Sequence, residues 1–164
     1  MSDEVAFVRA CAAAPTDRIV RLVYADWLEE RGDDRARFLR LEQEVYARQH
    51  GMENASGLDA ELALLAAGLK PEWMDLVGLK CDLLLQSFRP AYKIGVIKAV
   101  REVTGLGLRE AVDLVATTPS VILRHVSILL AIQGKASMEG GPHPWDGIPI
   151  ATGIIALPEN NGSL

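Results

Sequence analysis

The sequence predicts an α+β chain with two parts, a small helical domain over residues 1–78 and an α/β sandwich over residues 79–164. Apolar residues recur at helical spacing through the first part, between residues that cap or stop helices. The second part changes to strand-length apolar runs that flank two helical stretches. The charge is also divided, with 10 Lys and Arg against 15 Asp and Glu in residues 1–80 and 7 against 7 in residues 81–164.

Helix caps and breakers divide the first part into short helices. Ser2 precedes two acids, and its hydroxyl can accept a first-turn amide while the acids favour the positive end of the helix dipole. Pro15 ends this helix, Thr16 or Asp17 caps the next, and Gly32 offers its stop. The expected helical segments are residues 3–14, the segment from that cap to Gly32, residues 35–50, residues 58–69 and a short turn over residues 71–77, with a loop over residues 51–57.

The second part predicts the order strand, helix, helix, strand, with the helices on one face of a small sheet. The strands are expected over residues 82–88 and 121–126, and the helices over residues 92–103 and 108–117. After Ser127 the pattern degenerates, because residues 128–132 are all apolar and Gly134 weakens a helix by about 1 kcal/mol relative to Ala. We expect a degenerate third helix, shortened or covered by the tail, and a last strand could return over residues 150–157.

Composition limits the classes of protein that the chain can be. With 49% hydrophobic and 24% charged residues the chain has an average soluble composition, and a pI of about 5.2 makes nucleic acid an unlikely principal partner. The N-terminus is acidic where a signal peptide needs basic residues, and no apolar run reaches the roughly 18 residues of a membrane span, so we expect a cytoplasmic protein with no membrane partner. Cys11 and Cys81 lack metal-ligand spacing and are expected to be reduced thiols.

The expected helix over residues 92–103 has two contrasting arcs at 100° per residue. The apolar-basic arc is Ile94, Ile97, Lys98 and Arg101, and the core stripe opposite is Val96, Ala99, Val100 and Val103. The two isoleucines could pack beneath another element while the cations snorkel at its edge, or the arc could be a partner site. Five basic residues against two acidic ones within residues 89–110 would favour an acidic protein surface.

The string KIGVIKAVREVTGLGLREAVDLV, Lys93–Val115, closely resembles the signature of the C-terminal domain of the ribosomal stalk protein L-seven/L-twelve, and the resemblance extends with less force over residues 82–127. It implies a non-enzymatic protein-binding module, without cofactor or metal, that recruits translational GTPases such as elongation factors G and Tu to the ribosome. Carried over by position, the resemblance implies a binding face made of Ile94, Ile97, Lys98, Arg101, Leu108 and Glu110.

Departures from that family leave an alternative open. The family's N-terminal dimerisation segment and Ala-rich hinge have no counterpart in residues 1–80, its charged third helix is replaced by an apolar segment, and the tail from Gly140 has no match. The alternative is therefore a non-ribosomal paralogue or a protease-adaptor-like protein that uses the same helix face.

Residues 7–41, centred on LVYADWLEERGD, resemble a bacterial repeat-companion domain, expected over about residues 1–45, and residues 61–77 resemble the linker that often follows it. Asp26 projects within the apolar arc of this domain's second helix, where an unpaired carboxylate is costly to bury. We therefore expect Asp26 to be buried and to accept hydrogen bonds from an Arg or from backbone amides. The apolar arc that contains Asp26 consists of Ile19, Leu22, Val23 and Trp27. A lesser alternative for the function of the chain is an enzyme that uses Asp26 or His125.

Overall fold

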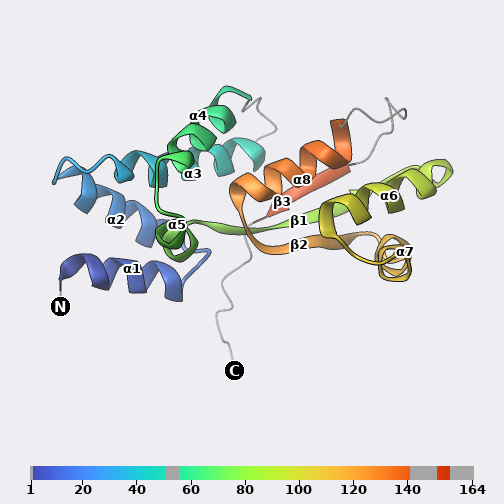
Figure 1. Ribbon diagram of the computed structural model, residues 1–164, viewed down its shortest axis with the longest axis horizontal. Helices are drawn as coiled ribbons and strands as arrows, with labels where there is room; N and C mark the ends of the chain where they lie inside the picture. Colours follow the sequence, from blue (N-terminus) through green and yellow to red (C-terminus); the bar gives the residue numbers. More distant parts are fainter. Residues whose placement is uncertain (1, 51–55, 141–150, 156–164) are drawn as a thin grey trace. The chain divides into compact units, whose positions relative to one another are not determined.

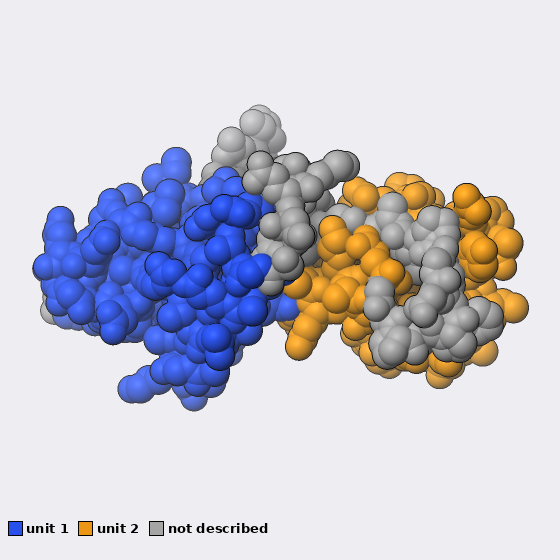
Figure 2. All heavy atoms as spheres, turned by 90° about the horizontal axis from the view of Figure 1, so that it is seen from above, with its two compact units in different colours: residues 1–80, 127–129, 156–164 blue, residues 81–126, 130–155 orange. Residues whose placement is uncertain are grey.

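The computed structural model describes residues 2–50, 56–140 and 151–155. Its helices and its small sheet confirm the predicted α+β class. The chain divides into two compact units, coloured separately in Figure 2, and each is described by itself. Unit 1 is built on residues up to 80 with 127–129, and unit 2 on residues 81–126 and 130–155. Within the described segments, no helix has both the length and the apolar character needed to cross a bilayer.

Unit 1 is an all-helical bundle, labelled in Figure 1. Its helices are α1 (Asp3–Ala13), α2 (Arg18–Glu29), α3 (Arg35–His50), α4 (Ser56–Ala67) and α5 (Pro71–Val77). The pair α2 and α3 forms the most extensive interface, while α1 packs on α2 and α5, and α4 packs on α3. All five predicted helical segments are thus confirmed; the expected loop over residues 51–57 lies outside the described residues, apart from its last two positions, which begin α4.

Two of the predicted capping and stop residues of unit 1 are confirmed, and one is corrected. The Asp17 carboxylate accepts the backbone amides of Ile19 at 2.8 Å and Val20 at 3.3 Å, so Asp17 is the N-cap of α2. Gly32 follows α2 with a φ of +66°, a conformation that glycine adopts without a steric penalty. Ser2 occupies the N-cap position of α1, but its hydroxyl makes no capping hydrogen bond, which corrects the predicted role of that side chain.

The predicted inward face of α2 is wrong. Arg21, Tyr24, Ala25 and Leu28 are its buried residues, whereas Ile19 and Val23 are exposed. Arg21 can be buried because its two terminal nitrogens donate to four backbone carbonyls, those of Cys11, Ala14, Asp17 and Gly78, at 2.7–3.1 Å. A polar side chain thus occupies the centre of unit 1, and a more apolar stripe is left at its surface.

Asp26 lies on that outer face and is not buried, since 63% of its side chain is exposed. The expected Arg partner is present, because Arg40 Nη2 donates to Asp26 Oδ1 and also to Glu29 Oε2, the latter at 2.7 Å. The prediction of a buried Asp26 is therefore wrong, and the prediction of an Arg partner is confirmed. An exposed ion pair of this kind contributes at most about 1 kcal/mol to stability.

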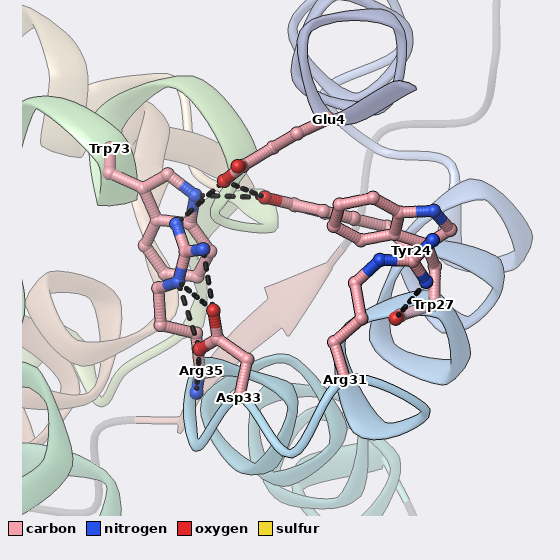
Figure 3. A network of polar contacts seen from close by, with 7 residues as sticks. All are labelled: Glu4, Tyr24, Trp27, Arg31, Asp33, Arg35 and Trp73. Carbon is pink, nitrogen blue, oxygen red and sulfur yellow. Dashed lines mark hydrogen bonds and ion pairs between the residues drawn. The ribbon is translucent and has the colours of Figure 1, made fainter. Parts of the chain in front are cut away.

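A polar network ties four helices of unit 1 together around Tyr24 (Figure 3). The Trp73 indole donates to the Tyr24 hydroxyl at 3.2 Å, and that hydroxyl lies 3.2 Å from Glu4 Oε1. Arg35 bridges Glu4, at 2.8 Å, and Asp33, at 2.6–3.0 Å. Burial raises the pKa of Tyr24 to about 12, so its hydroxyl stays protonated as a donor. The hydrogen bonds from Arg35 lower the pKa of Asp33.

The segment that leaves α5 is fixed inside unit 1. Val77 and Leu79 are fully buried, the Leu79 amide donates to both oxygens of the buried Glu42 at 3.2–3.3 Å, and the Lys80 amide donates to the Pro15 carbonyl at 2.9 Å. Gly78 is required here, because a Cβ at this position would lie 2.6 Å from the Met74 carbonyl oxygen. The chain thus enters the next strand from a buried, hydrogen-bonded junction.

Unit 2 has the predicted order of strand, helix, helix and strand, followed by one more helix and strand. Its elements are β1 (Lys80–Ser87), a 3-10 turn (Pro90–Tyr92), α6 (Lys93–Thr104), α7 (Leu108–Ala116), β2 (Ser120–Ser127), α8 (Ile128–Gly140) and β3 (Ala151–Ile155). The sheet order is β2-β1-β3, and β3 pairs antiparallel with β1, Asp82 opposite Ile155. The central β1 is mostly buried, with Leu83 and Leu85 at 0% exposure. These two side chains point to the same face of the sheet, and Leu83 packs against α8 at Gly134.

The third helix of unit 2 is complete, so the expected shortening is wrong. The 13-residue α8 begins at Ile128, and its Ile128, Ala131 and Met138 are buried. Gly134 does not interrupt it, because that glycine faces a tightly packed core where a Cβ would meet Leu83 Cδ2 at 2.8 Å and Leu123 Cδ1 at 3.1 Å. The alternative expectation, cover by the tail, concerns residues that are largely outside the described segments.

This packing predicts that Gly134→Ala destabilises unit 2 by about 1–2 kcal/mol, because overpacking outweighs the roughly 1 kcal/mol that alanine gains in a helix. Gly57→Ala in α4 is the control, since nothing lies within 4 Å of the added Cβ, and it is expected to be neutral or stabilising. Denaturant unfolding of both variants checks the prediction. Equal stabilisation by both substitutions would contradict the close packing of α8.

Candidate functional site

The turn between α6 and α7 sets the shape of the candidate site. Gly105 ends α6 with a φ of +72°, and the Thr104 hydroxyl accepts the Leu106 amide at 3.2 Å. Gly107 is the N-cap of α7, and a Cβ there would lie 2.5 Å from Glu110 Oε2. Glycine at 107 thus leaves room for the Glu110 carboxylate to fold back over the start of α7, where the helix dipole favours a negative charge.

The inward side of α6 is held by apolar packing. Val96 and Val100 are fully buried, Ala99 is nearly so, and α6 packs against α7 through a side that buries Ala111 and Val115. This places the predicted core stripe inside unit 2, with Val103 half-buried at its end. Because that side is fixed in the core, the opposite side of α6 must point to solvent.

The outward side carries the six predicted site residues, here called the α6 face: Ile94, Ile97, Lys98, Arg101, Leu108 and Glu110. All except Ile97, which is half-buried, are exposed. Ile94 is the most exposed large apolar residue among the described segments, at 83%, and Leu108 is also largely exposed. An exposed isoleucine and leucine beside two cations form an apolar patch with a charged rim, which is how many protein-binding surfaces are built.

The cations of the α6 face are available for a partner. Among the described residues, no carboxylate forms an ion pair with Lys98 or Arg101. Lys93, Arg89 and Arg109 are exposed around them. The positive charge is therefore not neutralised by the described residues of unit 2 and is suited to attract an acidic surface.

The two residues considered for catalysis lie in different units. Asp26 is paired with Arg40 in unit 1, whereas His125 is an exposed residue of β2 in unit 2. The described segments contain no cluster of His, Cys, Asp and Glu that could hold a metal ion. Cys11 and Cys81 are buried and form no disulfide within the described residues, Cys81 Sγ donates to the Val126 carbonyl at 3.6 Å, and burial raises the pKa of Cys11.

Sequence reasoning missed one buried acid in unit 2. Asp82 in β1 is almost fully buried, and its Oδ1 accepts the His125 amide at 3.0 Å. His125 has a φ of +51°, unusual for a residue with a side chain, and this conformation directs its amide to the carboxylate. An acid at the start of an otherwise apolar strand was the available signal in the sequence. Its role is to fix β1 against β2.

Comparisons with known proteins identify the second part of the chain. The family described as "Ribosomal protein L7/L12 C-terminal domain" matches residues 81–141. The large ribosomal subunit protein bL12c of Euglena gracilis is 34% identical over 104 residues, which cover 58% of this chain and 79% of that protein. The bL12 protein of Cellvibrio japonicus is 39% identical over 88 residues, 54% of this chain and 71% of the relative. The bL12 of Coxiella burnetii is 66% identical over 47 residues, 29% of this chain and 37% of the relative.

Proposed function

The chain belongs to the L7/L12 family of ribosomal proteins, and on that premise we propose that unit 2 recruits translational GTPases to the ribosome through the α6 face. The family consists of ribosomal proteins and not of enzymes, so a function in translation follows without a catalytic site. The observation that carries the proposal is that Ile94 and Leu108 are exposed in the same face as the exposed cations Lys98 and Arg101.

The two kinds of side chain on the α6 face have different tasks in the proposed binding. Covering the exposed isoleucine and leucine removes apolar surface from water, and full burial of such a side chain contributes roughly 1.5–3 kcal/mol. Lys98 and Arg101 act at longer range, because their charges accelerate the encounter with an acidic partner and orient it.

The proposal extends to unit 1 as a repeat-companion domain over about residues 1–45, with the domain boundary near residue 78. This boundary is supported by Val77 and Leu79, which are fully buried, and by the Leu79 amide, which donates to the buried Glu42 carboxyl group, so unit 1 ends inside its own core.

The proposal predicts that apolar and basic substitutions in the α6 face change different rate constants. Ile94→Ala is expected to increase the dissociation rate about tenfold with little dependence on salt, because it removes buried contact. Lys98→Ala is expected to decrease the association rate and to flatten its salt dependence, because it removes steering. The measurement is stopped-flow binding to purified elongation factor G over a series of salt concentrations.

Matched controls come from the same unit. Leu130→Ala in α8 removes another exposed apolar side chain, and Arg124→Ala in β2 removes another exposed cation, and neither is expected to alter binding. Co-sedimentation with ribosomes tests the family role separately from the GTPase. If the protein sediments with ribosomes but binds no elongation factor, the partner class is wrong. If it does neither, the α6 face serves a non-ribosomal partner, such as that of a protease adaptor.

A further inference from the structure

Unit 1 leaves an apolar and acidic stripe on the outside of α2. Ile19 is 73% exposed and Val23 49% exposed, and Leu22 beside them is half-buried. Towards the C-terminal end of α2 the same face carries exposed acidic residues, of which Asp26 is the first along the helix. No described element of unit 1 covers Ile19, although the buried side of α2 is filled by Arg21 and Tyr24. The stripe is therefore an unpartnered helix face and not part of the core.

The stripe on α2 has the same residue spacing as the α6 face. In α2 the positions i, i+3 and i+7 are Ile19, Leu22 and Asp26; in α6 they are Ile94, Ile97 and Arg101. Each trio has an exposed branched apolar residue first, a half-buried apolar residue second and an exposed charge third, and the third charges are opposite. The spacing of three and then four positions is that of a coiled-coil seam, in which two helices meet layer by layer.

Parallel packing of the two helices would match all three of these layers. Ile19 would meet Ile94, Leu22 would meet Ile97, and the Asp26 carboxylate would meet the Arg101 guanidinium. Antiparallel packing would instead place each charge against an isoleucine. The matched pattern thus specifies both the orientation and the register of the contact.

Charge supports the match although Asp26 already has a partner. Three acids, Asp26, Glu29 and Glu30, stand at this end of α2 and contact two cations, Arg40 and Arg31. The cluster can therefore accept one more cation. The Arg101 guanidinium has no carboxylate partner among the described residues, and it would supply that charge. The α6 face thus offers the α2 stripe an opposite charge at one layer and apolar contact at the two others.

We propose that the α2 stripe of one molecule docks in parallel on the α6 face of a second copy of this chain. The contact joins two different surfaces, so it is heterologous and can link more than two molecules. It goes beyond the proposed recruitment function, and because it covers the α6 face, self-association and partner binding exclude each other.

Sedimentation velocity of the full-length protein alone, without ribosome or GTPase, tests this contact. The weight-average mass is expected to rise with protein concentration and to fall as ionic strength rises. Ile19→Ala should weaken association, whereas Leu64→Ala in α4, another strongly exposed apolar position at 77%, should not. A protein that stays monomeric at every concentration overturns the proposal, whatever its binding to elongation factor G.

Charge reversal gives a test that misfolding cannot imitate. Asp26→Lys and Arg101→Glu should each weaken self-association at least about tenfold. A mixture of the two variants should associate again, because the Lys on α2 of the first meets the Glu on α6 of the second. Asp75→Lys and Arg124→Glu reverse exposed charges outside both surfaces and should behave like the unaltered protein. If the mixture stays dissociated, the parallel register is wrong.

Discussion

Val100→Asp is expected to unfold unit 2. Val100 is fully buried on the inward side of α6 beside Val96 and Ala99. The substitution removes apolar burial and places a carboxylate among buried apolar side chains, which costs several kcal/mol, while a domain of this size has only about 5–15 kcal/mol of stability.

Hydrogen exchange of the full-length protein checks this outcome unit by unit. Peptides from β1 and α6 should lose protection in Val100→Asp, whereas peptides from α2 and α3 should keep theirs. Ile94→Asp places the same carboxylate on the outward side of the same helix, and protection there should remain close to that of the unaltered protein. Equal loss of protection in both variants would mean that the two sides of α6 have been assigned wrongly.

Arg21→Met is expected to destabilise unit 1 by about 3–5 kcal/mol, because it leaves buried polar groups without their partner. Four backbone carbonyls lose their donor, and Glu42 loses a nearby guanidinium charge that lowers its pKa. Methionine restores the apolar volume of the side chain, so the loss reports the polar contacts and not a cavity. Denaturant unfolding provides the measurement, with Arg9→Met on the exposed side of α1 as the control.

The buried carboxyl group of Glu42 beside Arg21 predicts that the stability of unit 1 depends on pH. Burial raises the pKa of Glu42 from 4.5 to about 8, partly offset by the amide of Leu79 and the charge of Arg21. The folded state therefore holds this proton more tightly than the unfolded state, so the contribution of Glu42 is complete below pH 4.5 and is lost as the pH rises towards 8. Glu42→Gln cannot ionise, and its stability relative to the unaltered protein should increase over that interval. A difference that does not change with pH would contradict a protonated Glu42.

The sequence predicted the elements of this fold because their determinants are local. Asp17 caps α2 through amides two and three residues away, and Gly105 ends α6 through its own backbone conformation. The two sides of α6 were also readable, because a core stripe and an apolar-basic arc alternate within one helix. These features depend on neighbours within one or two helical turns, which the sequence lists directly.

The tertiary structure alone decided which polar residues are buried and which apolar residues are not. Arg21 is tolerated in the core because the Gly78 carbonyl, 57 residues away, is one of its partners. Gly134 fits α8 because Leu83 and Leu123 come from other elements to fill the space that a side chain would need. Asp26 looked costly on an apolar face, yet it lies in solvent because that face is the outer one. Burial is a property of contacts between distant segments, so periodicity identifies the two faces of a helix but not which of them the rest of the protein covers.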